Sequence, residues 1–160
     1  MSIGRFFAGV AALVRCRSDG KYLLLQRSAE KDVGGGAWEC VTGRVDQGEG
    51  FADAARREIR EELGVEAQID FVVGTMHLYR GERKPENEMV GVEFRCSVAD
   101  SAGIRTSAEH CAQRWATAQQ ADELLPADHW LRKLIQRAED IRTLSPPELL
   151  QCYLDSGFEL

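Results

Sequence analysis

The pattern of hydrophobic and polar positions predicts a series of strands in the first hundred residues of the chain, with one helix among them. Short apolar runs that are bounded by turn residues or glycine-rich loops are typical of strands. The segment Ser18-Asp19-Gly20 predicts a turn, and the polar residues 80–88 predict a long hairpin connection. The predicted strands are residues 7–17, 22–27, 38–41, 67–79 and 89–98.

Helical spacing of apolar residues predicts a helix over residues 51–63, ended by Gly64. Further helices are predicted at residues 119–125 and 128–143, and residues 107–117 mix loop and strand. One more short helix is predicted after Pro146 and Pro147. Strands outnumber helices and include adjacent pairs, and we see no internal repeat or linker. We therefore expect an α/β sandwich with a mixed sheet, formed as a single domain over residues 1–160.

Composition narrows the classes of partner. The net charge is −6 and neither end carries a run of Lys or Arg, which argues against binding to nucleic acid or to a membrane surface. No apolar stretch reaches the roughly 18 residues that a membrane span requires, and Arg15 and Arg17 interrupt the apolar run that could suggest a signal peptide. Five scattered cysteines without a CxxC pair argue against a zinc site or a disulfide framework, so we expect a cytoplasmic protein.

The helix over residues 51–63 places three glutamates, Glu58, Glu61 and Glu62, on one arc beside its apolar stripe. One interpretation is a solvated face whose charge the neighbouring arginines neutralise. The other is a metal site, because carboxylates at the edge of a buried face are partly desolvated and need a cation. Oxygen ligands alone favour a hard ion, Mg²⁺ or Mn²⁺.

The spacing of residues 43–65 carries a resemblance. A Gly is followed after five residues by Glu, and after seven more by Arg-Glu-aliphatic-any-Glu-Glu-any-Gly-aliphatic. This pattern is similar to the box of the Nudix hydrolases, and a weaker similarity continues on both sides, so the whole chain resembles a full-length Nudix domain. The fixed positions are filled by Gly43, Glu49, Arg57, Glu58, Ile59, Glu61, Glu62, Gly64 and Val65.

The resemblance implies metal-dependent hydrolysis of a pyrophosphate bond in a nucleoside diphosphate that is linked to another group. By the same resemblance, Glu58 and Glu62 are metal ligands, and Glu61 is a ligand or holds water beside them. An ion pair between Glu49 and Arg57 braces the loop and orients the ligand carboxylate. Gly43 has two interpretations: room for backbone to approach metal or phosphate, or a simple turn glycine.

The sequence does not decide the roles of four residues outside these ligands. Arg27 and Arg44 are either contacts for substrate phosphates or exposed surface charges. Thr42 stands where many relatives of the family have glycine, which puts the loop geometry there in doubt. Glu109 lies six residues before Trp115, as the general base does in some relatives, and is otherwise an exposed loop acid.

Aromatic and imidazole side chains receive a simpler interpretation. Trp38 is interpreted as a core residue rather than a platform for a base, and His77 and His110 as packing or hydrogen-bonding residues.

Within the predicted function, the substrate is the feature that the sequence determines least. The positions of Tyr79 and Pro85 do not match family markers for dinucleoside polyphosphates or ADP-ribose, which leaves a nucleoside triphosphate or similar small nucleotide. One alternative is a binding module for ADP-ribose or a nucleotide that does not hydrolyse it, although such a module would be expected to lose box glutamates. Another is an isomerase of isopentenyl diphosphate that uses Cys40, against which the intact box argues. Residues 146–160 could form an interface in a homodimer.

Overall fold

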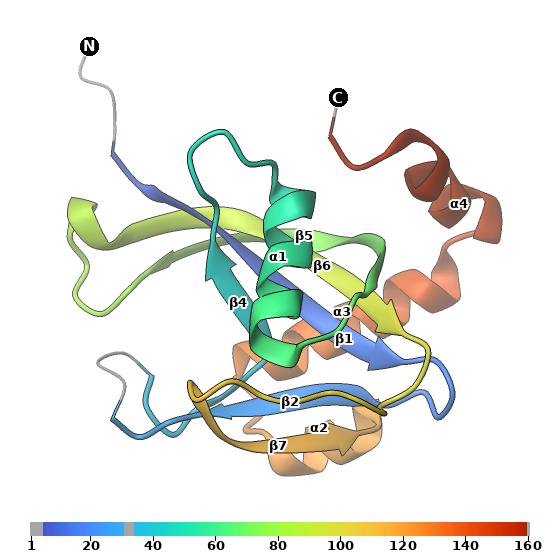
Figure 1. The fold of residues 1–160 in the computed structure, drawn as a ribbon, viewed down its shortest axis with the longest axis horizontal. Helices are drawn as coiled ribbons and strands as arrows, with labels where there is room; N and C mark the ends of the chain where they lie inside the picture. Colours follow the sequence, from blue (N-terminus) through green and yellow to red (C-terminus); the bar gives the residue numbers. More distant parts are fainter. Residues whose placement is uncertain (1–4, 31–33, 160) are drawn as a thin grey trace.

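The computed structural model of the chain describes residues 5–30 and 34–159, in which seven strands form one mixed sheet (Figure 1). The path through the sheet is β3-β2-β1-β6-β5, while β4 pairs with β1 and β7 pairs with β2. The strands are β1 (Phe7–Cys16), β2 (Tyr22–Arg27), β3 (Trp38–Glu39), β4 (Val41–Arg44), β5 (Gln68–Tyr79), β6 (Glu88–Val98) and β7 (His110–Ala116). The helices are α1 (Phe51–Leu63), α2 (Ala118–Leu124), α3 (Trp130–Leu144) and α4 (Pro147–Ser156), with a 3-10 turn η1 (Pro85–Asn87).

Strand β1 lies at the centre of the sheet and is buried on both faces. It runs parallel to β6 and antiparallel to β2 and β4. Val10, Ala12 and Val14 pack into the core beneath α1, whereas Ala11 and Leu13 pack into a second core beneath α2 and α3. Because both faces of this strand are covered, its sequence is a continuous apolar run rather than an alternating one.

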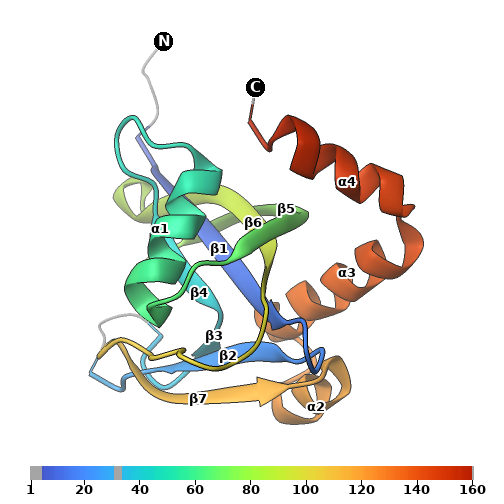
Figure 2. The same cartoon turned by 45° about the vertical axis from the view of Figure 1, so that its right-hand side comes forward.

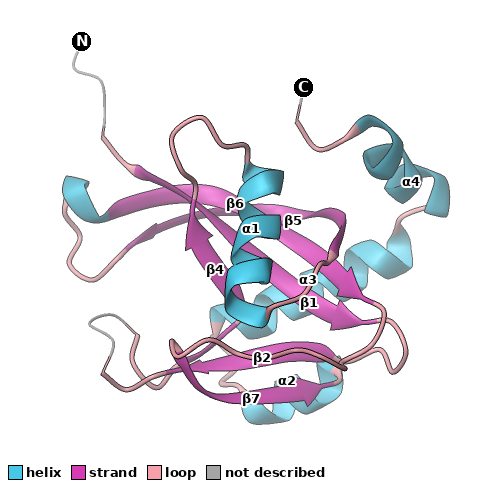
Figure 3. Ribbon diagram, viewed as in Figure 1, coloured by secondary structure: helices cyan, strands magenta, loops and turns pink. Residues whose placement is uncertain are grey.

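The helices cover both faces of the sheet, which confirms the predicted α/β sandwich. Figure 2 shows α1 on one side of the strands and α2 and α3 on the other, and Figure 3 shows the same layers by type of element. The chain continues from α3 into α4, which packs against β5. None of the helices in the described part of the chain combines the length and apolar character that a membrane crossing needs.

Most predicted elements are confirmed, with one difference of substance. The predicted strand 38–41 is two strands, because β3 pairs with β2 whereas β4 pairs with β1. Thr42 and Gly43 therefore lie inside β4, opposite Ala11 and Val10, and not in a loop. The expectation of uncertain loop geometry at Thr42 is corrected by this pairing.

Candidate active site

Helix α1 presents its apolar stripe to the core, as the spacing predicts. Ala52, Ala55, Ile59 and Leu63 are buried. Glu62 lies beside this stripe and is buried too, with a side chain that is only 10% exposed. Because Glu62 is next to the buried residues of α1, its carboxyl group lies below the protein surface, where a carboxylate loses hydration.

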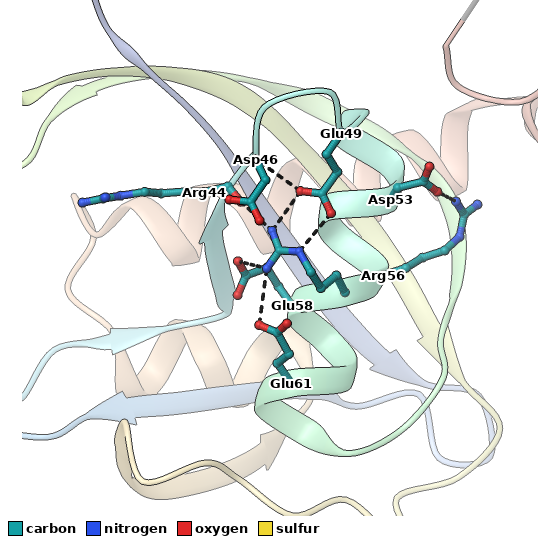
Figure 4. A network of polar contacts seen from close by, with 8 residues as sticks. Arg44, Asp46, Glu49, Asp53, Arg56, Glu58 and Glu61 are labelled. Carbon is teal, nitrogen blue, oxygen red and sulfur yellow. Dashed lines mark hydrogen bonds and ion pairs between the residues drawn. The ribbon is translucent and has the colours of Figure 1, made fainter.

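Arg57 holds the acidic groups together through all five of its donor hydrogens. Its Nε donates to Glu49 Oε1 at 2.9 Å, and Nη2 donates to Glu49 Oε2 at 2.9 Å and to the carbonyl oxygen of Arg44 at 2.8 Å. Its Nη1 donates to Glu58 Oε1 at 2.8 Å and to Glu61 Oε2 at 3.3 Å. In Figure 4, dashed lines join Glu49, Glu58 and Glu61 to the guanidinium group that is drawn without a label.

The electrostatic consequence differs between the partners of Arg57. The hydrogen bonds from Arg57 lower the pKa of Glu49, which also accepts the backbone N–H of Asp46. The pKa of Glu58 is raised because burial outweighs its hydrogen bond from the guanidinium. Glu58 is thus a partly desolvated carboxylate held in one orientation.

Gly43 lies directly under the Glu58 carboxyl group. A Cβ at this position would lie 1.9 Å from Glu58 Cδ, far inside van der Waals contact. Gly43 is a strand residue without positive φ, so the interpretation as a turn glycine is wrong. The structure gives a different reason for the glycine, which is the close approach of a side chain from α1 to the backbone of β4.

Glu62 has the most perturbed carboxyl group in the site. Burial, followed by the negative charges of Glu58, Glu39 and Glu109 in that order of effect, raises its pKa to about 9. Its Oε2 atom is buried without a hydrogen-bond partner, and His110 Nε2 is 3.9 Å away. In the described part of the chain, the charges that shift the pKa of this group are all negative.

Glu39 is a site residue that the sequence reasoning missed. It is buried, and both of its oxygens accept from Arg27 Nη1, at 3.1 and 3.0 Å. His110 Nε2 lies 3.1 Å from Glu39 Oε1, and the His110 side chain is 3% exposed. The signal was an acid within the otherwise apolar stretch Trp38–Val41, where a charge needs buried partners.

The aromatic and imidazole interpretations are confirmed. Trp38 packs against the core beneath α2 and α3. His110 bonds Glu39, and His77 Nε2 lies 2.9 Å from Glu88 Oε1.

The positive charges of Arg44 and Arg27 act on the guanidinium group of Arg80. Arg80, directly after β5, is half-buried, and its pKa is lowered first by burial and then by the charges of Arg44 and Arg27. Arg44 lies over the ring of Phe7, 4.5 Å from its centroid, and neither Arg44 nor Arg80 forms a salt bridge with another described residue. Arg27 is paired with Glu39 and is 19% exposed, so its interpretation as an exposed charge is wrong.

Glu109 reaches the same acidic group from another part of the chain. It directly precedes β7, and its carbonyl oxygen accepts the backbone N–H of Ser28 at 2.9 Å. Its negative charge is among those that raise the pKa of Glu62. The structure thus brings Glu109 near α1 although 47 residues separate it from Glu62 in the sequence.

Glu61 is set apart from the other glutamates of the box. Its side chain is 59% exposed, against 14% for Glu58. Within residues 5–30 and 34–159, no three His, Cys, Asp or Glu side chains converge closely enough to surround a metal ion as they stand. The fit of a cation therefore rests on the chemistry of Glu58 and Glu62, two carboxyl groups of α1 that supply oxygen donors and whose pKa values burial raises.

The arrangement combines acids and arginines on adjacent elements. Carboxylates of α1 can hold a hard cation, and the guanidinium groups of Arg44 and Arg80, which form no salt bridge with another described residue, can bind phosphate oxygens. Such a combination suits chemistry on an anionic, phosphorylated substrate.

Comparisons with known proteins agree with this chemistry. Residues 5–138 match the family model described as the NUDIX domain. The chain is 35% identical over 121 residues to the CTP pyrophosphohydrolase of Escherichia coli strain K12, covering 74% of this chain and 83% of that protein. It is 34% identical over 128 residues to an octanoyltransferase of Myxococcus xanthus, covering 79% of this chain but 35% of that protein. The crystal structure of a MutT protein from Methanosarcina mazei Go1 has the same fold, with a TM-score of 0.70, 23% identity, and coverage of 91% and 100% of the two chains.

Proposed function

Because the chain belongs to the NUDIX domain family and is a pyrophosphohydrolase of that family, we propose that it hydrolyses a pyrophosphate bond of a nucleoside triphosphate with Mg²⁺. The nucleoside triphosphate is chosen over other nucleotides because of the similarity to a CTP pyrophosphohydrolase, which spans most of both chains. Mn²⁺ is expected to replace Mg²⁺, since the ligands are carboxylate oxygens.

The observation that carries this proposal is the state of Glu62. A buried carboxyl group with a partnerless oxygen and three acidic neighbours is costly without a cation. Glu58 and Glu62 would hold the metal, and Glu61 would bind it directly or through water. When bound, the cation supplies neutralisation of phosphate oxygens and a lower pKa for its water.

The residues around these ligands have supporting roles. Glu49 and Arg57 orient Glu58, and Gly43 leaves the space that the Glu58 carboxyl group occupies. The buried contacts of Glu39 with Arg27 and His110 hold an acid whose charge raises the pKa of Glu62. Partners of this kind set the orientation and basicity of the ligands they contact.

We assign substrate phosphates to Arg44 and Arg80. Both are without a salt bridge to described residues, and mutual repulsion of guanidinium groups is relieved by a bound polyanion. Arg27 is already bound to Glu39, and it contributes positive charge to the same region. The net charge of −6 makes such a local cluster necessary for binding an anionic substrate.

Glu109 is proposed as the general base that takes the proton from the attacking water. It is a carboxylate on a separate segment, near Glu62, and it is not in the row of box glutamates on α1. In-line attack on a phosphate requires that the water is held and deprotonated at a defined place.

Two other functions are less well supported. An isomerase that uses Cys40 would need an accessible thiol, but Cys40 is 1% exposed and burial raises its pKa well above the usual range. A binding module without hydrolysis has no need for a complete set of box glutamates.

We also retain the expectations of a cytoplasmic protein, supported by five free cysteines, and of a homodimer through residues 146–160.

The deciding experiment is a screen of the purified protein with Mg²⁺ against CTP, the other nucleoside triphosphates and ADP-ribose. Products are separated by chromatography, and the Glu62→Gln variant serves as the inactive control. Formation of a nucleoside monophosphate and pyrophosphate from at least one triphosphate supports the proposal. Binding of a nucleotide without any product, in both proteins, would favour the binding module.

A further inference from the structure

Helix α1 begins without a cap from its own sequence. Its N-cap residue is Gly50, which has no side chain, and Asp53 in the first turn pairs instead with Arg56. The first backbone N–H groups of a helix have no partner within the helix, and a side-chain acceptor usually satisfies one of them. The helix that carries Glu58 and Glu62 therefore depends on a partner from elsewhere.

That partner is Glu159. Its Oε1 atom accepts the backbone N–H of Phe51 at 2.6 Å, across 108 residues of sequence. A Cβ on Gly50 would lie 2.2 Å from Glu159 Oε2, so the carboxyl group occupies the space that a side chain would take. A carboxylate at this place is also favoured by the positive end of the helix dipole.

An aromatic contact holds this carboxyl group in place. Phe158 meets the buried ring of Phe94 edge to face, with centroids 5.8 Å apart, and packs into the core beneath α1. Tyr153 of α4 stacks on Phe158, at 5.6 Å and an interplanar angle of 5°. A groove of about 440 Å³ between α1, β5 and α4 is lined in part by Phe158 and Glu159. The segment 157–159 is therefore anchored by packing as well as by the hydrogen bond.

A chain of contacts connects the capped end of α1 to Glu58, one of the proposed metal ligands. Gly50 follows Glu49, whose two carboxyl oxygens are bound by Arg57, and Arg57 also donates to Glu58. A change at Gly50 thus acts on Glu58 through Glu49 and Arg57. The segment that supplies the cap lies beyond residue 138, outside the part of the chain that matches the NUDIX domain.

We propose that Glu159 is a positioning residue of the hydrolase: by capping α1 it fixes the Glu49–Arg57 pair and, through it, the orientation of Glu58. The catalytic helix is completed by a segment that follows the domain in the sequence, so the activity depends on how that segment is folded. Only the kinetic part of the following test rests on the proposed function.

The test compares Glu159→Ala with a matched control and a rescue. Asp155→Ala removes an acid of α4 that accepts a hydrogen bond from Gln151 Nε2, a residue of α4 itself, at 2.8 Å. Gly50→Ser in the Glu159→Ala background supplies a local cap. Serine is compatible with the backbone at position 50, where φ is −82° and ψ is 160°. The void left by Glu159 gives it room.

The first measurement is hydrogen exchange of the Arg57 Nε–H in NMR spectra of the metal-free protein, which requires no substrate. We expect the Arg57 Nε–H to exchange at least about threefold faster in Glu159→Ala, a factor that matches the usual stabilisation of a helix by its cap. The rate should equal that of the wild type in Asp155→Ala and should return toward it in the double variant. Melting temperatures are recorded for the same four proteins. A lower melting temperature with an unchanged Arg57 exchange rate would show that Glu159 is only structural and would overturn the proposal.

The second measurement is kcat with the substrate found in the screen. A loss of about threefold or more in Glu159→Ala that Gly50→Ser restores supports the proposal. If kcat is the same in all four proteins, the cap does not position the site and the proposal is wrong. If the wild type turns over no nucleotide, the proposed function fails, whereas the exchange measurement still decides the role of Glu159.

Discussion

The carboxyl group of Glu58 rests on the backbone of Gly43, so close that a Cβ on Gly43 would lie 1.9 Å from Glu58 Cδ. A methyl group there must displace the end of the glutamate side chain, which is flexible, rather than the backbone of β4. We therefore predict that Gly43→Ala folds but lowers kcat at least about tenfold, because Glu58 loses its place beside Arg57.

The control for this prediction is the same substitution in a Glu58→Gln background. If the methyl group acts through Glu58, it should cause little further loss of kcat in that background. Steady-state kinetics of the two single variants and the double variant provide the comparison. A Gly43→Ala enzyme with the wild-type kcat would contradict the structural relationship.

Metal dependence follows from the burial of Glu62 and from the negative charges of Glu58, Glu39 and Glu109 near it. We predict that activity disappears in excess chelator and returns with Mg²⁺ or Mn²⁺, because the carboxylates alone cannot activate water or neutralise phosphates. The same cations should raise the melting temperature of the metal-free protein, since binding to the native state stabilises it. Full turnover in excess chelator would be incompatible with the proposed site.

Substitution of the two proposed ligands should separate activity from stability. We predict that Glu58→Gln and Glu62→Gln each lower kcat by at least about a hundredfold. In the metal-free protein, Glu62→Gln should not lower the melting temperature, because the variant removes a buried acid whose charged form is unfavourable. Enzyme assays and thermal melts without metal measure the two effects.

Glu66→Gln is the matched control for these variants. Glu66 lies just after α1, is 69% exposed and pairs with Arg60, so its loss should change kcat by less than about threefold. Near-normal rates for both ligand variants would mean that the metal site is assigned to the wrong residues.

The sequence predicted the helix α1 to the residue because its local signals agree with its packing. Ala52, Ala55, Ile59 and Leu63 recur at helical spacing and are buried, and Gly64 at the C-cap has the left-handed backbone that was predicted. The bounds of β2 were predicted equally well, since an apolar run ends there at charged residues. Periodicity and end signals that point to the same structure make such elements predictable.

Other parts of the site depend on contacts between distant residues, which no local pattern reveals. The break between β3 and β4 follows from a change of partner strand, and the buried pair of Glu39 and His110 joins residues 71 positions apart. Arg80 was not considered from the sequence, because it lies in a polar hairpin whose path the spacing does not determine. The cap on α1 by Glu159 is the longest-range case, since neither residue shows a signal for the other.

The arginine cluster predicts an effect on substrate binding. We expect Arg44→Gln and Arg80→Gln each to raise KM about tenfold with a smaller change of kcat, as for a lost charged hydrogen bond to a phosphate. Arg83→Gln is the control, because Arg83 belongs to the same hairpin but lies over the ring of Tyr79, 5.4 Å from its centroid. Unchanged KM values in both test variants would exclude these guanidinium groups from the phosphate site.

The identity of the general base can be decided by separating proton transfer from metal binding. If Glu109 accepts the proton of the attacking water, Glu109→Gln should lower kcat by roughly 10²–10⁴ while the affinity for Mn²⁺ changes little. The reason is positional: Glu109 is near Glu62 but on the loop before β7, whereas the proposed ligands lie on α1. Glu62→Gln should differ by losing Mn²⁺ affinity as well, which titration of each variant with Mn²⁺ alone would measure.

A Glu109→Gln enzyme within about threefold of the wild-type kcat would identify Glu109 as an exposed loop acid. A large loss in Glu61→Gln or Glu49→Gln would then place the base in the box itself.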